Sequence, residues 1–211
     1  MFAKEETMPK NKTETRQKII SAAKAEFLKK GFEQASLRNI AMEAGMSAAG
    51  LYRHFTDKEA LFAALVDPVL DKLENVHCSI RMRDYEYLKT GLLDEMWGDN
   101  AEIHYFLDLI YDYFEEFKLL ICCSAGTKYE NFIHDFVMLE QKETLEYMEA
   151  ARKQGISVRK VEPRELHLLL SAYATAVFEV VVHDFSKKEA AHYLSKLQVF
   201  FYPGWRAVLG L

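Results

Sequence analysis

Residues 36–59, SLRNIAMEAGMSAAGLYRHFTDKE, contain helix caps and a glycine corner at spacings that could set a short helix against DNA. Ser36 is a suitable N-cap for a first helix, and Gly45 suits the left-handed residue that ends it. Ser47 would cap a second helix over residues 48–54. Two short helices joined by a tight turn are typical of a helix-turn-helix, in which the start of the second helix meets base edges in the major groove.

The outward face of the second helix offers groups that could meet DNA, although the spacing alone fits a plain helical hairpin about equally well. Leu51 and Phe55 lie four residues apart and share the inward face. The outward positions begin with small residues, which let a helix approach closely, and continue with groups that can hold phosphates. They are Ser47, Ala48, Ala49 and Gly50, followed by Tyr52, Arg53 and His54. Thr56 and Glu59 are spaced as a capping box for the next helix, which would place Lys58 beside the groove.

This stretch, with FLKKGFEQASLRNIAMEAG before it, resembles the DNA-binding domain of the TetR family of transcriptional regulators. The resemblance runs without a gap from residue 13 to about residue 65. The matching residues include Gly31-Phe32, Gly45, Leu51-Tyr52, Phe55 and Lys58-Glu59. It implies an all-α fold, with an N-terminal three-helix helix-turn-helix domain and a larger C-terminal helical bundle for ligand binding and dimerisation.

At matching positions the resemblance also implies roles for single residues. Arg38 would reach a base or a phosphate. Base edges would be contacted by Ser47, Ala48, Ala49 and Gly50, and phosphates by Tyr52, His54 and Lys58. Ala48, Ala49 and Gly50 offer little hydrogen bonding, so direct readout would depend on Arg38, Ser47, apolar contact with thymine methyls, or DNA shape.

Composition and charge agree with a protein that presents one end to nucleic acid. Residues 1–60 carry 11 Lys and Arg against 8 Asp and Glu, a balance of +3, whereas the remaining residues carry 16 and 24, a balance of −8. The three cysteines lack the spacing of a disulfide set or a metal site, which indicates reduced thiols and a cytoplasmic protein. The start of the chain is polar, and the longest apolar run, 166–182, is short for a membrane span. No cofactor, metal site or enzyme motif is indicated.

Along the chain we expect a flexible arm at 1–12, the DNA-binding domain at 13–60, and a ligand-binding and dimerisation domain at 61–211. Pro68 would kink the fourth helix and could act as a hinge or as a static bend. The first helix is expected at 13–30, ended by Gly31, and the fourth at 57–76; the others are expected at 85–96, 101–118, 127–154, 163–185 and 187–202, the last broken by Pro203-Gly204.

The body is rich in aromatic residues, more than a plain bundle needs, although an aromatic stripe at helical spacing is usually core. Following the resemblance, we expect several rings to line a cavity for an apolar or aromatic small molecule. The candidate ligand-binding residues are Trp97, Tyr105, Tyr111, Phe114, Phe132, Phe136 and Thr175.

The last two long helices would pair with their copies in a homodimer, as the resemblance implies. Glu179 is costly to bury without a partner, and with Thr175 it could lie in the cavity or at the dimer seam, which we favour. The candidate interface residues are Ala172, Ala176, Glu179, Leu194, Leu197 and Phe201.

The sequence therefore predicts a homodimeric, DNA-binding transcriptional regulator, a repressor relieved by a small-molecule effector. A two-fold dimer would read two half-sites about 34 Å or a multiple apart, so the operator in double-stranded DNA should be nearly palindromic. The alternative is a helical ligand-binding or protein-interaction module that does not bind DNA.

Overall fold

The computed structural model describes residues 10–98 and 101–211, and most of the predicted arm lies outside them. Within these residues the fold is all-α, as predicted, and has no strand. The helices are α1 (Lys10–Gln34), α2 (Leu37–Glu43), α3 (Ala48–Leu51), α4 (Lys58–Thr90), α5 (Leu93–Gly98), α6 (Ala101–Asp112), α7 (Phe114–Cys122), α8 (Phe132–Lys153), α9 (Pro163–Val182) and α10 (Lys187–Leu209).

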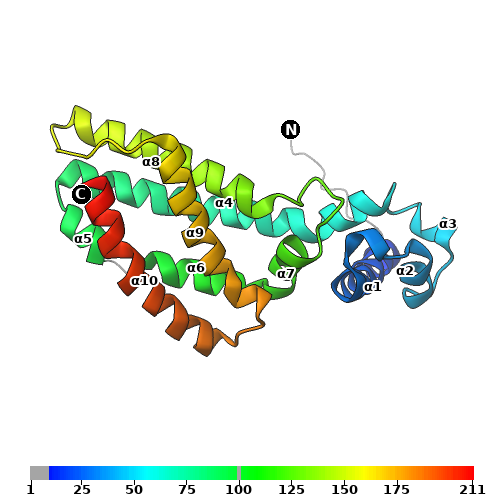
Figure 1. The fold of residues 1–211 in the computed structure, drawn as a ribbon. Helices are drawn as coiled ribbons and strands as arrows, with labels where there is room; N and C mark the ends of the chain where they lie inside the picture. The colour runs from blue at the N-terminus through cyan, green and yellow to red at the C-terminus, as the bar shows by residue number, and fades with distance from the viewer. Residues whose placement is uncertain (1–9, 99–100) are drawn as a thin grey trace, which may run out of the picture.

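The first three helices form a small head at one end of the molecule, and α4 runs from this head along the larger helical body (Figure 1). Aromatic rings join the two parts: Phe62 of α4 packs against Phe27 and Phe32 of α1, with centroids 5.2 and 5.5 Å away, and against Tyr129 of the body at 5.9 Å. The N–H of Phe32 also donates to the carbonyl of Cys123 at 2.9 Å. The head is thus packed directly on the end of the body.

α1 extends beyond its predicted end because a short helical segment follows a kink at Gly31. This residue has φ 72° and ψ 165°, outside helical geometry, so the prediction that the first helix stops there is correct for the backbone. The segment after the kink places the Phe32 ring against the Phe62 ring of α4.

α4 is much longer than predicted. It has 33 residues and contains both the predicted fourth helix and the first part of the helix predicted at 85–96. Its inward stripe continues through His77, Ile80 and Leu88, all buried, and Gly91 with φ 74° ends it. The helix continues through Pro68, and the hinge stays a hypothesis.

Other predicted helix boundaries also differ from the structure. The aromatic helix predicted at 101–118 is divided into α6 and α7 at Tyr113, whose φ of −132° and ψ of 40° leave the helical region. α10 does not end before Pro203 but continues to Leu209. Its last turn is held by Arg159, whose N–H donates to the Leu209 carbonyl at 2.8 Å and whose guanidinium donates to the Ala207 carbonyl at 2.7 Å.

α9 crosses the middle of the body and contacts α7, α8 and α10 (Figure 1). By length and composition it is the one helix in the described residues that could span a membrane. Its Leu166, Phe178 and Val181 are nearly inaccessible inside the body, as in the core helix of a helical bundle.

Candidate nucleic-acid interface and internal cavity

The two caps predicted for the helix-turn-helix are both present. The Ser36 hydroxyl accepts from the Asn39 N–H at 3.5 Å and opens α2, and the Ser47 hydroxyl accepts from the Gly50 N–H at 3.1 Å and opens α3. Between them Gly45 has φ 71°, a left-handed conformation that costs little only without a Cβ. The corner is therefore fixed by its own residues.

The second helix of this motif is shorter than predicted. α3 ends at Leu51, and the following N–H groups of Arg53 and His54 donate to carbonyls three residues back, at 3.2 and 2.9 Å. This tightened turn lets Phe55 reach the core, where it is 5 % exposed beside Leu51. Tyr52 and His54 thus lie on a turn and not on the helix proper.

The small residues predicted to approach DNA lie at an accessible surface. Ala49 is exposed, while Ala48 and Gly50 are half-buried. A Cβ built on Gly50 would meet its nearest neighbour, the Ser47 hydroxyl oxygen, at 3.5 Å, which is ordinary contact. The fold does not require glycine at position 50, although glycine in a helix costs about 0.5–1 kcal/mol relative to alanine.

Cationic and aromatic side chains surround this surface. Arg38 on α2 is exposed and Tyr52 is 54 % exposed. Two further candidates for phosphate contact are Arg53, which is exposed, and Arg16, whose guanidinium lies 4.5 Å from the centroid of the Phe55 ring. The sequence analysis placed Arg53 on the outward face, but the resemblance assigned no role to Arg53 or Arg16.

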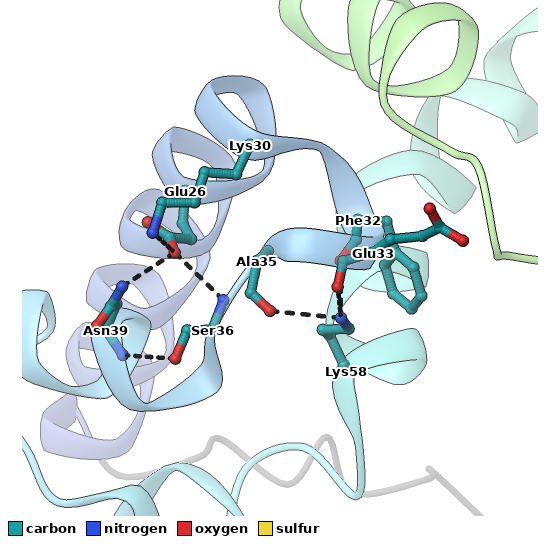
Figure 2. A network of polar contacts seen from close by, with 8 residues as sticks. All are labelled: Glu26, Lys30, Phe32, Glu33, Ala35, Ser36, Asn39 and Lys58. Carbon is teal, nitrogen blue, oxygen red and sulfur yellow. Dashed lines mark hydrogen bonds and ion pairs between the residues drawn. The ribbon is translucent and has the colours of Figure 1, made fainter.

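Lys58 has a different role from the predicted one. Its ammonium donates to the carbonyls of Phe32, Glu33 and Ala35 at 2.7, 3.0 and 3.3 Å, so its hydrogen bonds go to the end of α1 (Figure 2). It also lies 4.5 Å from the centroid of the Phe32 ring. These carbonyls form the negative end of a helix, which a cation stabilises. We therefore no longer count Lys58 as a phosphate ligand.

The predicted capping box of the fourth helix is also wrong. The N-cap of α4 is Asp57, whose carboxylate accepts from the Ala60 N–H at 2.7 Å, and the Thr56 hydroxyl donates to the same carboxylate. Glu59 instead accepts from the Lys128 N–H at 3.3 Å, a contact between α4 and the body. Asp57, one residue after Thr56, is the N-cap instead.

Replacing Lys58 with methionine is expected to lower the free energy of unfolding by about 2 kcal/mol, because charged hydrogen bonds to three carbonyls are lost while the apolar stem is kept. Urea unfolding followed by circular dichroism measures this. Lys18→Met, at an exposed position of α1, is the matched control and should change the free energy of unfolding by less than about 0.5 kcal/mol. Equal stability of both variants would contradict the assignment.

Glu26 of α1 is hydrogen-bonded to the start of α2. One carboxylate oxygen accepts from the Lys30 ammonium at 2.9 Å, the Ser36 N–H at 3.2 Å and the Asn39 amide at 3.2 Å (Figure 2). Desolvation raises the pKa of this carboxyl, but the bonds from Lys30, Ser36 and Asn39 outweigh it and lower the pKa below its ordinary value. The charged form is therefore the one that stabilises the head.

Glu26→Gln is expected to lower the free energy of unfolding at pH 7 by about 1 kcal/mol. Because the folded pKa is lowered, the wild-type contribution is present above the unfolded pKa and is lost as pH falls through the folded pKa. The difference between the two proteins in urea unfolding should therefore vanish in strong acid. Glu14→Gln, at an exposed site of the same helix, should show no such pH-dependent difference. A difference that persists in acid would show that Glu26 acts by packing alone.

The body contains a cavity of about 220 Å³ bounded by α4, α5, α6, α8, α9 and α10. We call it the aromatic chamber. Its walls include the rings of Trp97, Phe106, Phe136, Tyr173, Phe178, Tyr202 and Trp205. A second hollow of about 160 Å³, the polar chamber, adjoins it and shares six lining residues, among them Asp84 and Glu140.

Only two of the seven predicted ligand residues, Trp97 and Phe136, line either chamber. Tyr105 is 54 % exposed, and Thr175 is exposed on the outer side of α9. The other three belong to packed contacts. Phe132 is a core residue beside Phe178, the Tyr111 hydroxyl donates to the Phe185 carbonyl at 2.6 Å, and Phe114 packs on the Tyr111 ring at 5.3 Å. Trp205 was missed because the last long helix was predicted to end at residue 202, before Pro203, whereas Tyr202 lay inside that predicted helix and was not chosen as a candidate.

The predicted dimer residues divide between an outer and an inner side of the last two helices. Ala172 is exposed, and Ala176, Glu179 and Phe201 are half-buried, whereas Leu194 and Leu197 are buried inside the same chain. Leu194, 0 % exposed, cannot contact a second copy without repacking, so these two leucines are removed from the prediction. The exposed apolar residues on this outer side are Leu168, Leu169 and Val182 on α9, and Val199 and Phe200 on α10.

Glu179 is neither deeply buried nor directed into the cavity. Its carboxylate pairs with the His183 ring nitrogen one turn later at 2.9 Å, and its side chain is 38 % exposed. The partner that the Glu179 carboxylate needs is therefore His183, which lies one turn later in the same chain.

Geometry therefore defines an all-α protein with a helix-turn-helix head on a larger helical body. Residues 19–65 match the family described as bacterial regulatory proteins, tetR family. The chain is 32 % identical over 62 residues to the uncharacterized HTH-type transcriptional regulator YfiR of Bacillus subtilis, and 41 % identical over 64 residues to the HTH-type transcriptional regulator TtgR of Pseudomonas putida. These matches cover 29–30 % of this chain and 29–30 % of the two relatives.

By residues 19–65 the N-terminal head is thus similar to the TetR family of bacterial regulatory proteins, and the chain matches less than a third of the length of these two relatives. Among solved structures, two of NalD from Pseudomonas aeruginosa, described as the secondary repressor of the MexAB-OprM multidrug efflux pump, share the fold at TM-scores of 0.53 and 0.50. They are 19 % and 18 % identical and cover 88 % and 90 % of this chain, and 95 % and 96 % of theirs. At this identity the likeness concerns the fold alone. The names of the relatives agree with the prediction that the chain is not an enzyme.

Proposed function

We propose that the protein is a DNA-binding transcriptional regulator of the bacterial cytoplasm, acting as a homodimeric repressor. The observation that carries this proposal is the accessible surface at Ser47, Ala49 and Gly50, where small residues project from a capped corner and the fold itself does not require glycine. Exposed Arg38 and Arg53 flank it with charges suited to phosphates. Residues 13–60 would bind DNA, and residues 61–211 would bind the effector and the second copy.

Dimerisation supplies what a single four-residue helix lacks. One α3 contacts few base pairs, whereas two heads related by a two-fold axis read a near-palindrome. The outer side of α9 and α10 supports this assembly, because Val199 and Phe200 are 76 and 77 % exposed in the single chain. Large apolar residues grouped on one face favour a protein contact there.

The two chambers are the proposed effector site. They lie between α4, which continues into the head, and α9 and α10, which carry the proposed dimer face. A ligand that prefers a conformation with wrongly spaced heads must weaken DNA binding by the same factor, and a tenfold effect needs only about 1.4 kcal/mol of differential affinity.

The test is selection of bound sequences from random duplex DNA by the purified protein, followed by binding measurements at increasing salt. We expect a near-palindromic consensus and a logarithmic affinity that falls steeply and linearly with the logarithm of salt concentration, since phosphate neutralisation releases counterions. Failure to enrich any palindromic sequence, or binding insensitive to salt, would refute the proposal.

A further inference from the structure

The chemistry of the two chambers restricts the ligands that they can hold. The aromatic chamber presents ring faces and edges from five helices, among them Trp97, Phe106 and Trp205. Such walls bind a flat apolar ring, and their quadrupoles also attract a cation. Its charged lining residues are two carboxylates, Asp84 and Glu140, and one guanidinium, Arg83. An acidic excess in an aromatic site favours a positive over a negative ligand.

The polar chamber continues this acidic character. Glu143 joins Asp84 and Glu140 there, facing Arg81 and His77 of α4. Arg81 is held by Glu143 at 2.9 Å, so its charge is compensated at that position. The remaining cation, on His77, depends on protonation, and its Nε2 lies 2.7 Å from Glu140 and 3.5 Å from Glu143. Glu140, with a side chain 29 % exposed, thus faces both chambers and loses its cationic partner whenever His77 is neutral.

The ionisation of these side chains agrees with a negative potential. The hydrogen bond to Glu140 raises the pKa of His77 although burial opposes it, with further support from Glu143 and opposition from Arg81. Burial and the nearby Asp84 raise the pKa of the Tyr147 hydroxyl, and burial with Glu146 raises that of Tyr85. The surroundings therefore stabilise the positive form of His77 on α4 and disfavour the negative forms of Tyr85 on α4 and Tyr147 on α8.

We propose that the effector is a small aromatic molecule with a cationic amine, its ring in the aromatic chamber and its ammonium against Glu140. This inference rests on the proposed function only in taking the chambers as the effector site. The ammonium and the His77 proton compete for the same carboxylate, so the ligand binds more tightly as His77 loses its proton. The excess of carboxylates over guanidinium groups in the aromatic chamber disfavours a carboxylate on the same ring.

The test uses isothermal titration calorimetry of the full chain with three probes that share one ring: 2-naphthylmethylamine, 2-naphthylmethanol and 2-naphthoate. We expect the amine to bind at least about tenfold more tightly than the alcohol, and the naphthoate to bind weakest. The affinity for the amine should rise as the pH is raised through the pKa of His77, which lies above its ordinary value, while the affinity for the alcohol stays constant. Equal binding of amine and alcohol, tighter binding of naphthoate, or no binding of any probe would overturn the proposal.

A matched pair of variants tests whether the ammonium of the ligand binds at Glu140. Glu140→Gln should lower the affinity for the amine about tenfold and leave that for the alcohol within about twofold. Glu146 lies on the same helix, its side chain is 53 % exposed, and it lines neither chamber. Glu146→Gln should therefore alter neither affinity. Loss of amine binding in both variants, or in neither, would contradict the role of Glu140. Because the three probes are compared on the wild-type protein, the charge preference is tested even where Glu140→Gln folds poorly.

The readout separates this inference from the proposed function. Calorimetry needs no DNA, so a wrong ligand class leaves selection of a palindromic sequence untouched. Conversely, a protein that selects no DNA could still bind the amine in preference to its neutral and anionic counterparts.

Discussion

Replacing Ala49 with glutamate is expected to weaken binding to the selected palindrome by about 100-fold or more, which corresponds to about 2.7 kcal/mol. Ala49 is exposed at the start of α3, so a longer acidic side chain projects from the surface proposed to enter the groove. There it meets phosphates of like charge and holds the helix away from the base edges. Fluorescence anisotropy with labelled duplex measures the loss.

The same substitution elsewhere in the head separates this effect from net charge. Ala25→Glu adds the same side chain at an exposed site of α1, and we expect it to cost less than about tenfold in DNA affinity. Both variants should unfold at the temperature of the wild type, because neither alanine contributes to the buried core. Equal losses at the two positions would mean that α3 is not the reading element.

Replacing Phe200 with glutamate is expected to convert the dimer to monomer and, at nanomolar protein, to abolish detectable binding to the palindrome. Phe200 is 77 % exposed in the single chain, so the substitution disturbs no intrachain core. In a two-fold interface it introduces two carboxylates into an apolar contact, each costing several kcal/mol unless paired. Analytical ultracentrifugation measures the mass, and anisotropy measures the affinity.

Met82→Glu is the matched control for the dimer face. Met82 is 59 % exposed on α4, and the variant exchanges a large exposed apolar residue for the same acid away from α9 and α10. It should remain dimeric and bind DNA as the wild type does. A dimeric Phe200→Glu variant would place the interface elsewhere on the body.

The accuracy of the sequence predictions depended on how local the responsible interactions are. The corner of the motif could be read from the sequence, because the Ser36 and Ser47 caps bond to amides three residues away and Gly45 needs only its own backbone freedom. The inward pair Leu51 and Phe55 followed from helical spacing and is buried.

Errors arose where two local signals competed or where distant residues decided the outcome. Thr56 and Asp57 are both acceptable caps, and the structure uses the aspartate. Lys58 was predicted as a phosphate ligand, but the carbonyls that hold it belong to residues 23–26 positions earlier. α2 and α3 lie between the end of α1 and Lys58 in the chain, so no local spacing rule could have predicted this contact.

By itself, the sequence determined the all-α class and the local chemistry of the corner, because those depend on caps, periodicity and short-range hydrogen bonds. The family of the head was indicated by a resemblance and not by these patterns. The tertiary structure decided the length of α4, the continuation of α10 through Pro203 and the lining of the chambers. A proline costs a helix about 3 kcal/mol, yet the carbonyl that loses its partner belongs to Val199, whose side chain is 76 % exposed, and Arg159 holds the turn beyond it. Long-range contacts of this kind leave no periodic trace in the chain, so only the folded molecule brings Trp205 to the cavity.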